Sequence, residues 1–387
     1  MKRFLSGMMV VTMLFGVATV NVNASEDAAV VSTFAGTGSH GAADGMMAQF
    51  NLPASTLAAP NGVYVADTFN NLIRFIDWNG HVATVAGNIM GMDAQRFPVG
   101  LYRDGALNAA LLNRPADMIM GIGGNIFVLD SANHALRIIL QGGVFTFAGN
   151  GNAGHRDGNT VEALFNRPSA MAAGLDGAIY IADSGNHVIR RVDTMGNVTT
   201  VAGLAGAFGH RDGAANQALF SGPMGIAADS HGRIFVADTG NNLIRMIYEG
   251  EVTTLAGIMV FPHEIDPSIT YFSDGWDHIP LGGFADGSYD EAMFNMPRGL
   301  ALWQDILIVA DTGNHRIRAI LPDGEIITLA GSGLPGHDDG LPHAATFHLP
   351  QGVNVHDNML YISDTGNNAI RTINLYNSVL HAAIYSY

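Results

Sequence analysis

Ala237-Asp238-Thr239-Gly240-Asn241-Asn242-Leu243-Ile244-Arg245 is the stretch of sequence that decides the fold of this 387-residue chain. An Asp, a Ser or Thr, an Asn and an Arg recur at the same offsets in five further copies. The aspartates of those copies are Asp67, Asp130, Asp183, Asp311 and Asp364, and the matching arginines are Arg74, Arg137, Arg190, Arg318 and Arg371. Successive copies lie 53 to 73 residues apart. Six copies of one unit indicate a repeat architecture, because a single unit cannot bury its apolar faces alone.

The third unit shows what each repeat encodes. A run of small residues at Pro168 to Ala172 is followed by apolar runs at Ile179 to Ala182, His187 to Val192 and Val198 to Gly203. Gly, Asn and Asp separate these runs, which is typical of four short strands joined by tight turns. The runs are nearly all apolar instead of alternating, so we expect both faces of each sheet to be buried.

Six four-stranded antiparallel sheets of this kind predict an all-β fold, a six-bladed β-propeller closed into a ring. Ring closure covers the faces and the long edges that a single sheet would expose. The first strand of each unit is expected to lie at the axis, where crowding requires small residues. Small residues occupy this position at Ala54, Ala116, Gly225, Gly299 and Gly352.

The repeated pattern G-x-[IL]-A … G-x-I-Y-[VI]-A-D-[TS]-x-N-[HN]-x-I-R resembles the NHL repeat, here in six copies. The resemblance covers residues 29–376, which we expect to form one domain. It implies a six-bladed propeller, and the chain resembles secreted NHL-repeat proteins of bacterial type. Propellers of this family serve as protein-binding, RNA-binding and, rarely, catalytic modules, so the resemblance implies little about chemistry.

Residues 1–24 have the composition of a secretory signal peptide. Lys2 and Arg3 precede an apolar stretch, and Ala24 ends a cleavage site of small residues. A retained anchor is the alternative, although the apolar stretch is short for a membrane span. We therefore expect an exported protein, secreted or in the cell envelope, that does not insert into a membrane after cleavage.

Two segments compete for the outer strand of the last blade. Val30 to Gly36 carries the Ala-Gly ending of the fourth strands, yet it precedes the first complete unit. We expect this N-terminal strand to close the ring by pairing with the last unit. The alternative is Ser378 to Ile384, within a C-terminal tail at 377–387 that could also add an extra edge strand.

The charge of the chain argues against several classes of partner. Its 18 basic and 34 acidic residues give a net charge of −16, and loss of Lys2 and Arg3 would leave 16 − 34 = −18. Nucleic acids and anionic membranes require a basic surface, which this composition does not favour. No cysteine is present, so the sequence has no disulfide framework and no lipid-anchor cysteine. We expect a monomer that binds neither nucleic acid nor membrane.

A second repeated element, Asp-Gly followed by a short run and often a Pro, lies between successive units. We expect it to form a capped helical turn over each blade junction, and its aspartates are Asp44, Asp104, Asp157, Asp212, Asp286 and Asp339. In an antiparallel meander these loops emerge on the same face as the Asp-Thr-Gly-Asn turns. Two of the loops are longer, at 88–103 and 258–285, and they precede units that stand opposite each other in the ring.

The repeated Asp and Arg are interpreted as structural, because a feature present in every unit serves the fold. Asp238 and its equivalents are expected to bond the backbone two residues on in an Asx-turn, while Arg245 and its equivalents pair with Asp or bond carbonyls between blades. Calcium is the one metal considered, at the acidic loop 336–340, and otherwise we expect no metal and no cofactor. The repeated histidines spread around the ring, whereas zinc requires its ligands close together.

The residues expected at the axis do not favour catalysis. The positions where the first strands begin contain one carboxylate and no histidine, so the patterns expected of a gluconolactonase-like or an amidating-lyase-like site are absent. A G-x-S-x-G motif and a cysteine nucleophile are absent as well. We therefore name no catalytic residue. A metal-dependent lactonase or lyase that uses the channel and an envelope scaffold without a small-molecule site are the alternatives.

Residues that break the six-fold pattern form the candidate binding site. Four larger residues replace small ones at the channel mouth, namely Asp117, Met224, Arg298 and Gln351. The long loop adds Tyr271, Trp276 and His278 as a rim, unless these side chains pack beneath their own loop. Asp117 and Arg298 belong to opposed units and would present opposite charges across the channel. We expect a non-catalytic propeller that binds a protein, peptide or glycan on its loop-bearing face.

Overall fold

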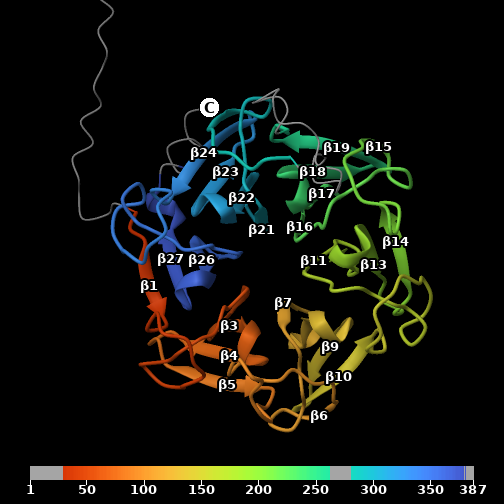
Figure 1. The fold of residues 1–387 in the computed structure, drawn as a ribbon, viewed down its shortest axis with the longest axis vertical. Coiled ribbons are helices and arrows are strands. Elements are labelled where there is room, and N and C mark those ends of the chain that lie inside the picture. The colour runs from red at the N-terminus through yellow and green to blue at the C-terminus, as the bar shows by residue number, and fades with distance from the viewer. Residues whose placement is uncertain (1–28, 262–279, 379, 381–387) are drawn as a thin grey trace, which may run out of the picture.

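The computed structural model describes residues 29–261, 280–378 and 380 of the chain. These residues form an all-β propeller of six antiparallel sheets, as the repeats predict (Figure 1). The predicted signal peptide at 1–24 and residues 262–279 of the long loop lie outside the described residues. Within the described part of the chain, no helix has the length and apolar character needed to cross a membrane.

Each blade is a meander whose first strand lies nearest the axis (Figure 1). The first strands are β2 (Ser55–Ala59), β7 (Pro115–Met120), β11 (Ala170–Ala173), β16 (Gly225–Ala228), β21 (Pro297–Trp303) and β25 (Gly352–His356). The second strands are β3 (Gly62–Asp67), β8 (Ile126–Asp130), β12 (Ile179–Asp183), β17 (Ile234–Asp238), β22 (Ile306–Asp311) and β26 (Met359–Asp364). The third strands are β4 (Leu72–Asp77), β9 (Ala135–Leu140), β13 (Val188–Val192), β18 (Leu243–Tyr248), β23 (Arg316–Ile320) and β27 (Ala369–Asn374). The fourth strands are β5 (Val82–Ala86), β10 (Gly143–Ala148), β14 (Val198–Ala202), β19 (Glu251–Ala256), β24 (Glu325–Ala330) and the N-terminal β1 (Ser32–Ala35).

Three blades have a fifth strand that the four-stranded expectation lacks. The Asp-Gly loops supply the two-residue strands β6 (Gly105–Ala106), β15 (Gly213–Ala214) and β20 (Gly287–Ser288), each paired with the fourth strand of its blade. The other three loops make a single bridge at the same place, as Gly45 does with Val82. The glycines here have φ between 100° and 153°, a region that favours glycine. The Asp-Gly pair therefore marks the point where the loop between blades pairs with the fourth strand, at the outer edge of the blade.

One-turn 3₁₀ helices join the second strand of each blade to the third. They are η1 (Thr68–Asn70), η3 (Ser131–Asn133), η4 (Ser184–Asn186), η5 (Thr239–Asn241), η7 (Thr312–Asn314) and η8 (Thr365–Asn367). An Asn or His follows each turn in the left-handed conformation, with φ between 51° and 59°. Two other short turns are η2 (Ile122–Gly124) and η9 (Leu375–Asn377).

The ring is closed by the N-terminal strand. β1 pairs antiparallel with β27, with Ser32 opposite Thr372 and Thr33 opposite Arg371. The edge of β27 that an alternative strand at Ser378 to Ile384 would need is thus already taken, and residues 381–384 lie outside the described residues. The latch predicted from the Ala-Gly ending is the strand that the structure shows.

The apolar core lies between neighbouring blades. One cluster, for example, joins Ala182 and Ile189 of the third blade to Phe220, Ile234 and Val236 of the fourth. Each buried isoleucine, valine or phenylalanine side chain of this kind contributes about 1.5–3 kcal/mol when it is withdrawn from water. Because every sheet packs on two neighbours, this burial requires the closed ring.

The axis is crowded on one side of the ring, as the small residues predict. A Cβ atom on Gly225 would lie 1.8 Å from the carbonyl oxygen of Arg298, and one on Gly299 would lie 2.4 Å from that of Gln351. A Cβ on Gly352 would lie 2.3 Å from the carbonyl oxygen of Ala54. Glycine therefore permits the inner strands of the last three blades and the first to approach one another closely.

Candidate functional site

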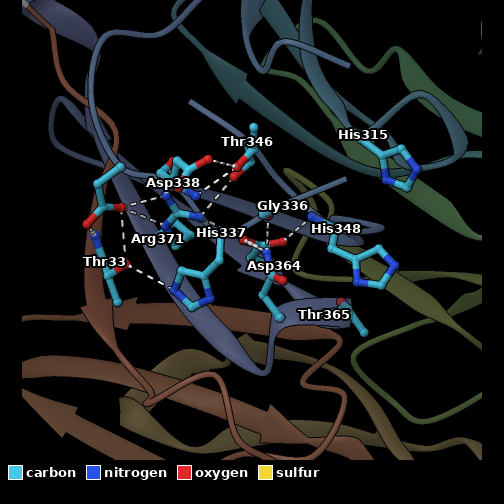
Figure 2. Close-up of polar contacts among 12 residues, drawn as sticks. Thr33, His315, Gly336, His337, Asp338, Thr346, His348, Asp364, Thr365 and Arg371 are labelled. Carbon is cyan, nitrogen blue, oxygen red and sulfur yellow. Dashed lines mark hydrogen bonds and ion pairs between the residues drawn. The ribbon is translucent and has the colours of Figure 1, made fainter. Parts of the chain in front are cut away.

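A buried ion-pair network spans each blade. In the last blade, Arg371 Nη1 lies 2.8 Å from a carboxylate oxygen of Asp364 and Nη2 lies 2.5 Å from one of Asp339 (Figure 2). All six repeat arginines are fully buried, and each contacts two aspartates. One is the Asp that ends the second strand, called the hairpin Asp below, and the other is the Asp of the Asp-Gly pair. Removing one partner from such a buried pair leaves an uncompensated charge, which costs about 3–5 kcal/mol. The network is the same in every blade, so it fixes each blade without distinguishing one from another.

The second Asp of the network does not cap a helical turn, contrary to the prediction from sequence. Asp339 accepts hydrogen bonds from the backbone N–H and the hydroxyl of Thr33 at 3.0 and 3.1 Å (Figure 2). The other Asp-Gly aspartates likewise contact a fourth-strand Thr. The carboxylate therefore joins the third strand to the fourth. Sequence spacing could not reveal this contact, because Thr33 is 306 residues away from Asp339.

The hairpin Asp also differs from the predicted Asx-turn. Asp238 accepts from the backbone N–H of Ser221 at 2.7 Å and from the side chain of Asn241 at 2.7 Å, and none of the hairpin aspartates bonds its own 3₁₀ turn as a cap. Its other contact is the ion pair with Arg245. The Asp thus holds the incoming loop, the hairpin Asn and the third strand together.

Each blade is tied to the next by a side chain that follows the hairpin. In three blades this side chain is a histidine, and its Nδ1 accepts a hydrogen bond at 2.9–3.0 Å from a backbone N–H of the next blade. The accepting and donating residues are His134 and Arg167, His187 and Gly222, and His315 and Leu349. In the other three, an asparagine Oδ1 does the same at 2.8–2.9 Å, from Asn71 to Arg114, Asn242 to Met296 and Asn368 to Leu52. Histidine and asparagine supply an acceptor at the same place, so these histidines belong to the junctions.

The channel mouth contains a cavity of about 450 Å³. Its wall is built from the beginnings of the six inner strands and from hairpin residues, which places it on the loop-bearing face. All four predicted mouth residues, Asp117, Met224, Arg298 and Gln351, line this cavity. The three predicted rim residues Tyr271, Trp276 and His278 lie outside the described residues.

Asp117 is engaged in holding the wall of the channel together. Its carboxylate accepts from the hydroxyl of Ser55 at 2.6 Å and from the backbone N–H groups of Met118 and Met171 at 2.8 and 2.7 Å. These contacts connect the inner strands of the first three blades. Burial raises the pKa of Asp117 to about 6, against the opposing effect of these hydrogen bonds. Asp117 remains mostly ionised at neutral pH, but its oxygens are largely occupied by the protein.

Arg298 lies in the opposite blade and has no such partners. It is half-buried, its Nε is buried without a hydrogen-bond partner, and it forms no ion pair with any described residue. Burial lowers the pKa of its guanidinium, although an arginine stays charged in proteins. The pairing register shifts between Pro297 and Leu300, a β-bulge of the kind that re-aims side chains. Among the described residues, the channel therefore holds a cation without an ion-pair partner, beside an apolar and hydroxyl-bearing wall.

The rim of the cavity carries a second arginine that sequence reasoning missed. Arg114 lies 4.7 Å over the ring of Phe69, and Phe69 contacts Phe97 of the 88–103 loop edge to face at 5.8 Å. Arg114 forms no ion pair within the described part of the chain, and both Arg114 and Phe69 line the channel cavity. A signal was present in the sequence, because Phe69 stands where four other hairpins have a glycine and one has Ala132.

Met224 and Gln351 contribute mainly backbone contacts to the mouth. Their N–H groups donate to the carbonyls of Ala237 and Ser363, each at 3.0 Å, within their own blades. The Gln351 carbonyl also accepts from Gly299 of the neighbouring blade at 2.8 Å. Among residues 29–261 and 280–378, no three His, Asp or Glu side chains come together as metal ligands would. The described side chains at the mouth offer a guanidinium, a carboxylate and several hydroxyls for recognition of a ligand.

The chain is similar in sequence to known NHL-repeat proteins over most of its length. The NHL repeat profile matches residues 220–245 and 294–320. The chain is 31% identical over 326 residues to the protein SUPPRESSOR OF QUENCHING 1 of Arabidopsis thaliana, a match that covers 77% of this chain and 28% of the plant protein. It is 27% identical over 322 residues to NHL repeat-containing protein 2 of Homo sapiens, covering 72% of this chain and 40% of the human protein. The chain thus spans less than half of these relatives.

Among solved structures, an auxiliary nutrient binding protein from Bacteroides thetaiotaomicron superposes with a TM-score of 0.63 and 16% identity, covering 89% of this chain and 76% of that one. At this identity the likeness concerns the fold alone.

Proposed function

The chain is an NHL-repeat β-propeller, and we propose that it is a non-catalytic binding module whose ligand presents an anionic group to Arg298 at the channel mouth. The ligand is a protein, a peptide or a glycan that carries a carboxylate or a comparable acidic group. The observation that carries this proposal is the unpaired guanidinium. Leaving a charged group buried without a partner is costly, and a bound anion would remove that cost.

The rest of the mouth supports the same ligand chemistry. Arginine presents a planar fork of donors that suits a carboxylate bidentately. Arg114 adds a second cation at the rim, held over Phe69, while Asp117 is occupied by three donors of the wall. Two arginines at one mouth that have no ion-pair partner in the described part of the chain stand out against a net charge of −16. The wall therefore favours an anionic end group and an apolar or hydroxylated body.

We also propose that the chain is exported. If residues 1–24 direct the chain out of the cytoplasm, the binding module works in the cell envelope or outside the cell. Solved neighbours with this fold include auxiliary nutrient binding proteins. A channel enzyme and a scaffold remain the two alternatives from the sequence.

The test uses arrays of acidic glycans and of peptides with free or amidated C-termini, probed with the wild-type protein and with Arg298→Gln. Hits are then titrated by calorimetry. We expect acidic probes to bind the wild type and to lose about ten- to a hundredfold in affinity with Arg298→Gln, since a hydrogen bond to a charged group contributes about 1.5–3 kcal/mol. The control is Arg233→Gln, because Arg233 pairs with Asp229 away from the mouth. Equal affinity of the Arg298 variant and the wild type would refute the proposal.

A further inference from the structure

A second cavity, of about 440 Å³, lies at the opposite end of the ring from the channel mouth. It is formed where the last blade meets the first, by the turns that join first to second and third to fourth strands. Those turns emerge on the face away from the hairpins and the Asp-Gly loops. Its main polar and aromatic residues are Trp78, His356, Asp357, Asn358, Tyr361 and Asn374. None of these residues belongs to the repeated ion-pair network.

Trp78 is the residue that makes this cavity unusual. It is 46% exposed, and the corresponding turns of the other blades have no tryptophan. Its indole Nε1 donates to the carbonyl of Pro60 at 3.1 Å, so the edge of the ring is anchored to the neighbouring turn. Its ring centroid lies 6.5 Å from that of Tyr361, with a tilt of 36° between the planes. A large apolar surface is thus held in water at a fixed place.

Tyr361 brings a hydroxyl group to the same cavity. Its ring is buried and packs edge to face against Phe34 of β1 at 5.8 Å, so the side chain has little freedom. The hydroxyl makes no hydrogen bond with a residue in the described part of the chain. Burial and then the negative charge of Asp357 raise the pKa of Tyr361. Tyr361 and Asp357 both line the cavity, which therefore offers a hydroxyl group and a carboxylate.

Two amides add further donors. The Oδ1 of Asn358 accepts from the indole N–H of Trp303 at 3.2 Å, and the Oδ1 of Asn374 accepts from the backbone N–H of Tyr376 at 3.0 Å. Each amide is thereby oriented, and its NH₂ group has no partner among the described residues. The carboxylate of Asp357 is 89% exposed and lies 3.8 Å from Nε2 of His356, and no lysine or arginine is among the described residues that line the cavity.

From this arrangement we propose that the cavity binds a neutral sugar ring, either a free monosaccharide or a terminal residue of a glycan. A pyranose has an apolar C–H face that packs on an aromatic ring, and hydroxyls that each need a donor and an acceptor. The volume lies within the range of about 300–1,000 Å³ found for ligand sites. Asp357 disfavours an anionic sugar. A single exposed aromatic face does not form the cage of several rings that binds quaternary ammonium ions.

This site is separate from the anion site, so the two proposals stand or fall independently. The experiment is saturation-transfer NMR and calorimetry with the mature chain against glucose, galactose, mannose and N-acetylglucosamine, with tetramethylammonium as a competing cation. We expect at least one sugar to bind, with at least a tenfold loss in Trp78→Ala and in Asp357→Ala and a smaller loss in Trp78→Phe. Arg298→Gln should leave sugar binding unchanged.

The matched control is Tyr248→Ala. Tyr248 is 40% exposed at the corresponding end of β18, on the same face, but it does not line this cavity. Three results would overturn the proposal: no binding of any of these sugars by the folded wild type, equal sugar affinity in Trp78→Ala and the wild type, or displacement of the sugar by tetramethylammonium at lower concentration than by a second sugar. A thermal melt of each variant verifies that it is folded.

Discussion

We expect this propeller to lose stability in mild acid at three of its six blade junctions, where a histidine side chain accepts a hydrogen bond from the next blade. A histidine Nδ1 accepts a backbone N–H only while it is unprotonated, and His134, His187 and His315 each do so. Burial lowers the pKa of all three, with a further contribution from Arg167 at His134 and from His348 at His315. The test uses the triple substitution His134→Asn, His187→Asn and His315→Asn, which gives all six junctions an asparagine acceptor.

The sign and size of the effect follow from the contacts. The pKa of each histidine is lower in the folded state than the unfolded value of 6.5, so the stability that it provides is complete above pH 6.5 and is lost as the pH falls below it. Each junction hydrogen bond contributes about 0.5–1.5 kcal/mol, so three contribute about 1.5–4.5 kcal/mol. We expect the wild type to lose that much more unfolding free energy between pH 7.5 and 5 than the triple variant does.

Urea unfolding followed by far-UV circular dichroism at the two pH values measures this difference. His343→Asn is the control, because His343 is exposed and ties no junction. It should leave the pH dependence unchanged. The reasoning is refuted if the triple variant and the wild type lose equal free energy on acidification.

Three further predictions concern the fold and the site. Deleting residues 25–36 removes β1 from the last blade and should lower the unfolding midpoint markedly, whereas a melting temperature equal to that of the parent would reject the N-terminal latch. Asp238→Ala leaves the fully buried Arg245 with one ion-pair partner, the half-exposed Asp212, so we expect a loss of about 3–5 kcal/mol in urea unfolding. Asp212→Ala, on the exposed side of the same network, should cost clearly less, and the reverse order would contradict the account. Arg298→Ala and Trp276→Ala should each weaken ligand binding in calorimetry with no change in the melt, and an unchanged affinity of Trp276→Ala would remove Trp276 from the site.

The ring could be predicted from the sequence because its determinants are local and repeated. Short apolar runs, turn residues and the Ala-Gly ending of the N-terminal strand each lie within a few residues of one another. The partners of the repeated Asp and Arg could not be predicted in the same way. Arg371, for example, contacts Asp339 at a separation of 32 residues, and spacing alone does not say which carboxylate faces which strand.

The candidate site was partly predictable for the same reason. Broken symmetry identified the four mouth residues, but only the structure distinguishes Asp117, which is occupied by the wall, from Arg298, which is not. Whether a charge is paired depends on every neighbour in space, and no pattern along the chain carries that information. Phe69 and Trp78 break the pattern too, but they lie in turns and not where the first strands begin.

Closure of the ring by β1 brings the beginning and the end of the propeller together. Because β1 lies beside β27, the backbone N–H of Ala29 is only 3.2 Å from the carbonyl oxygen of Asn377. A short linker would join these two points, so circularly permuted versions with new ends at an exposed turn between other blades should keep all six sheets. The same proximity lets a longer polypeptide enter and leave the ring at one place, so that the propeller can be inserted between flanking domains without opening. Relatives in which the matching region makes up 28% or 40% of the protein are compatible with that kind of assembly.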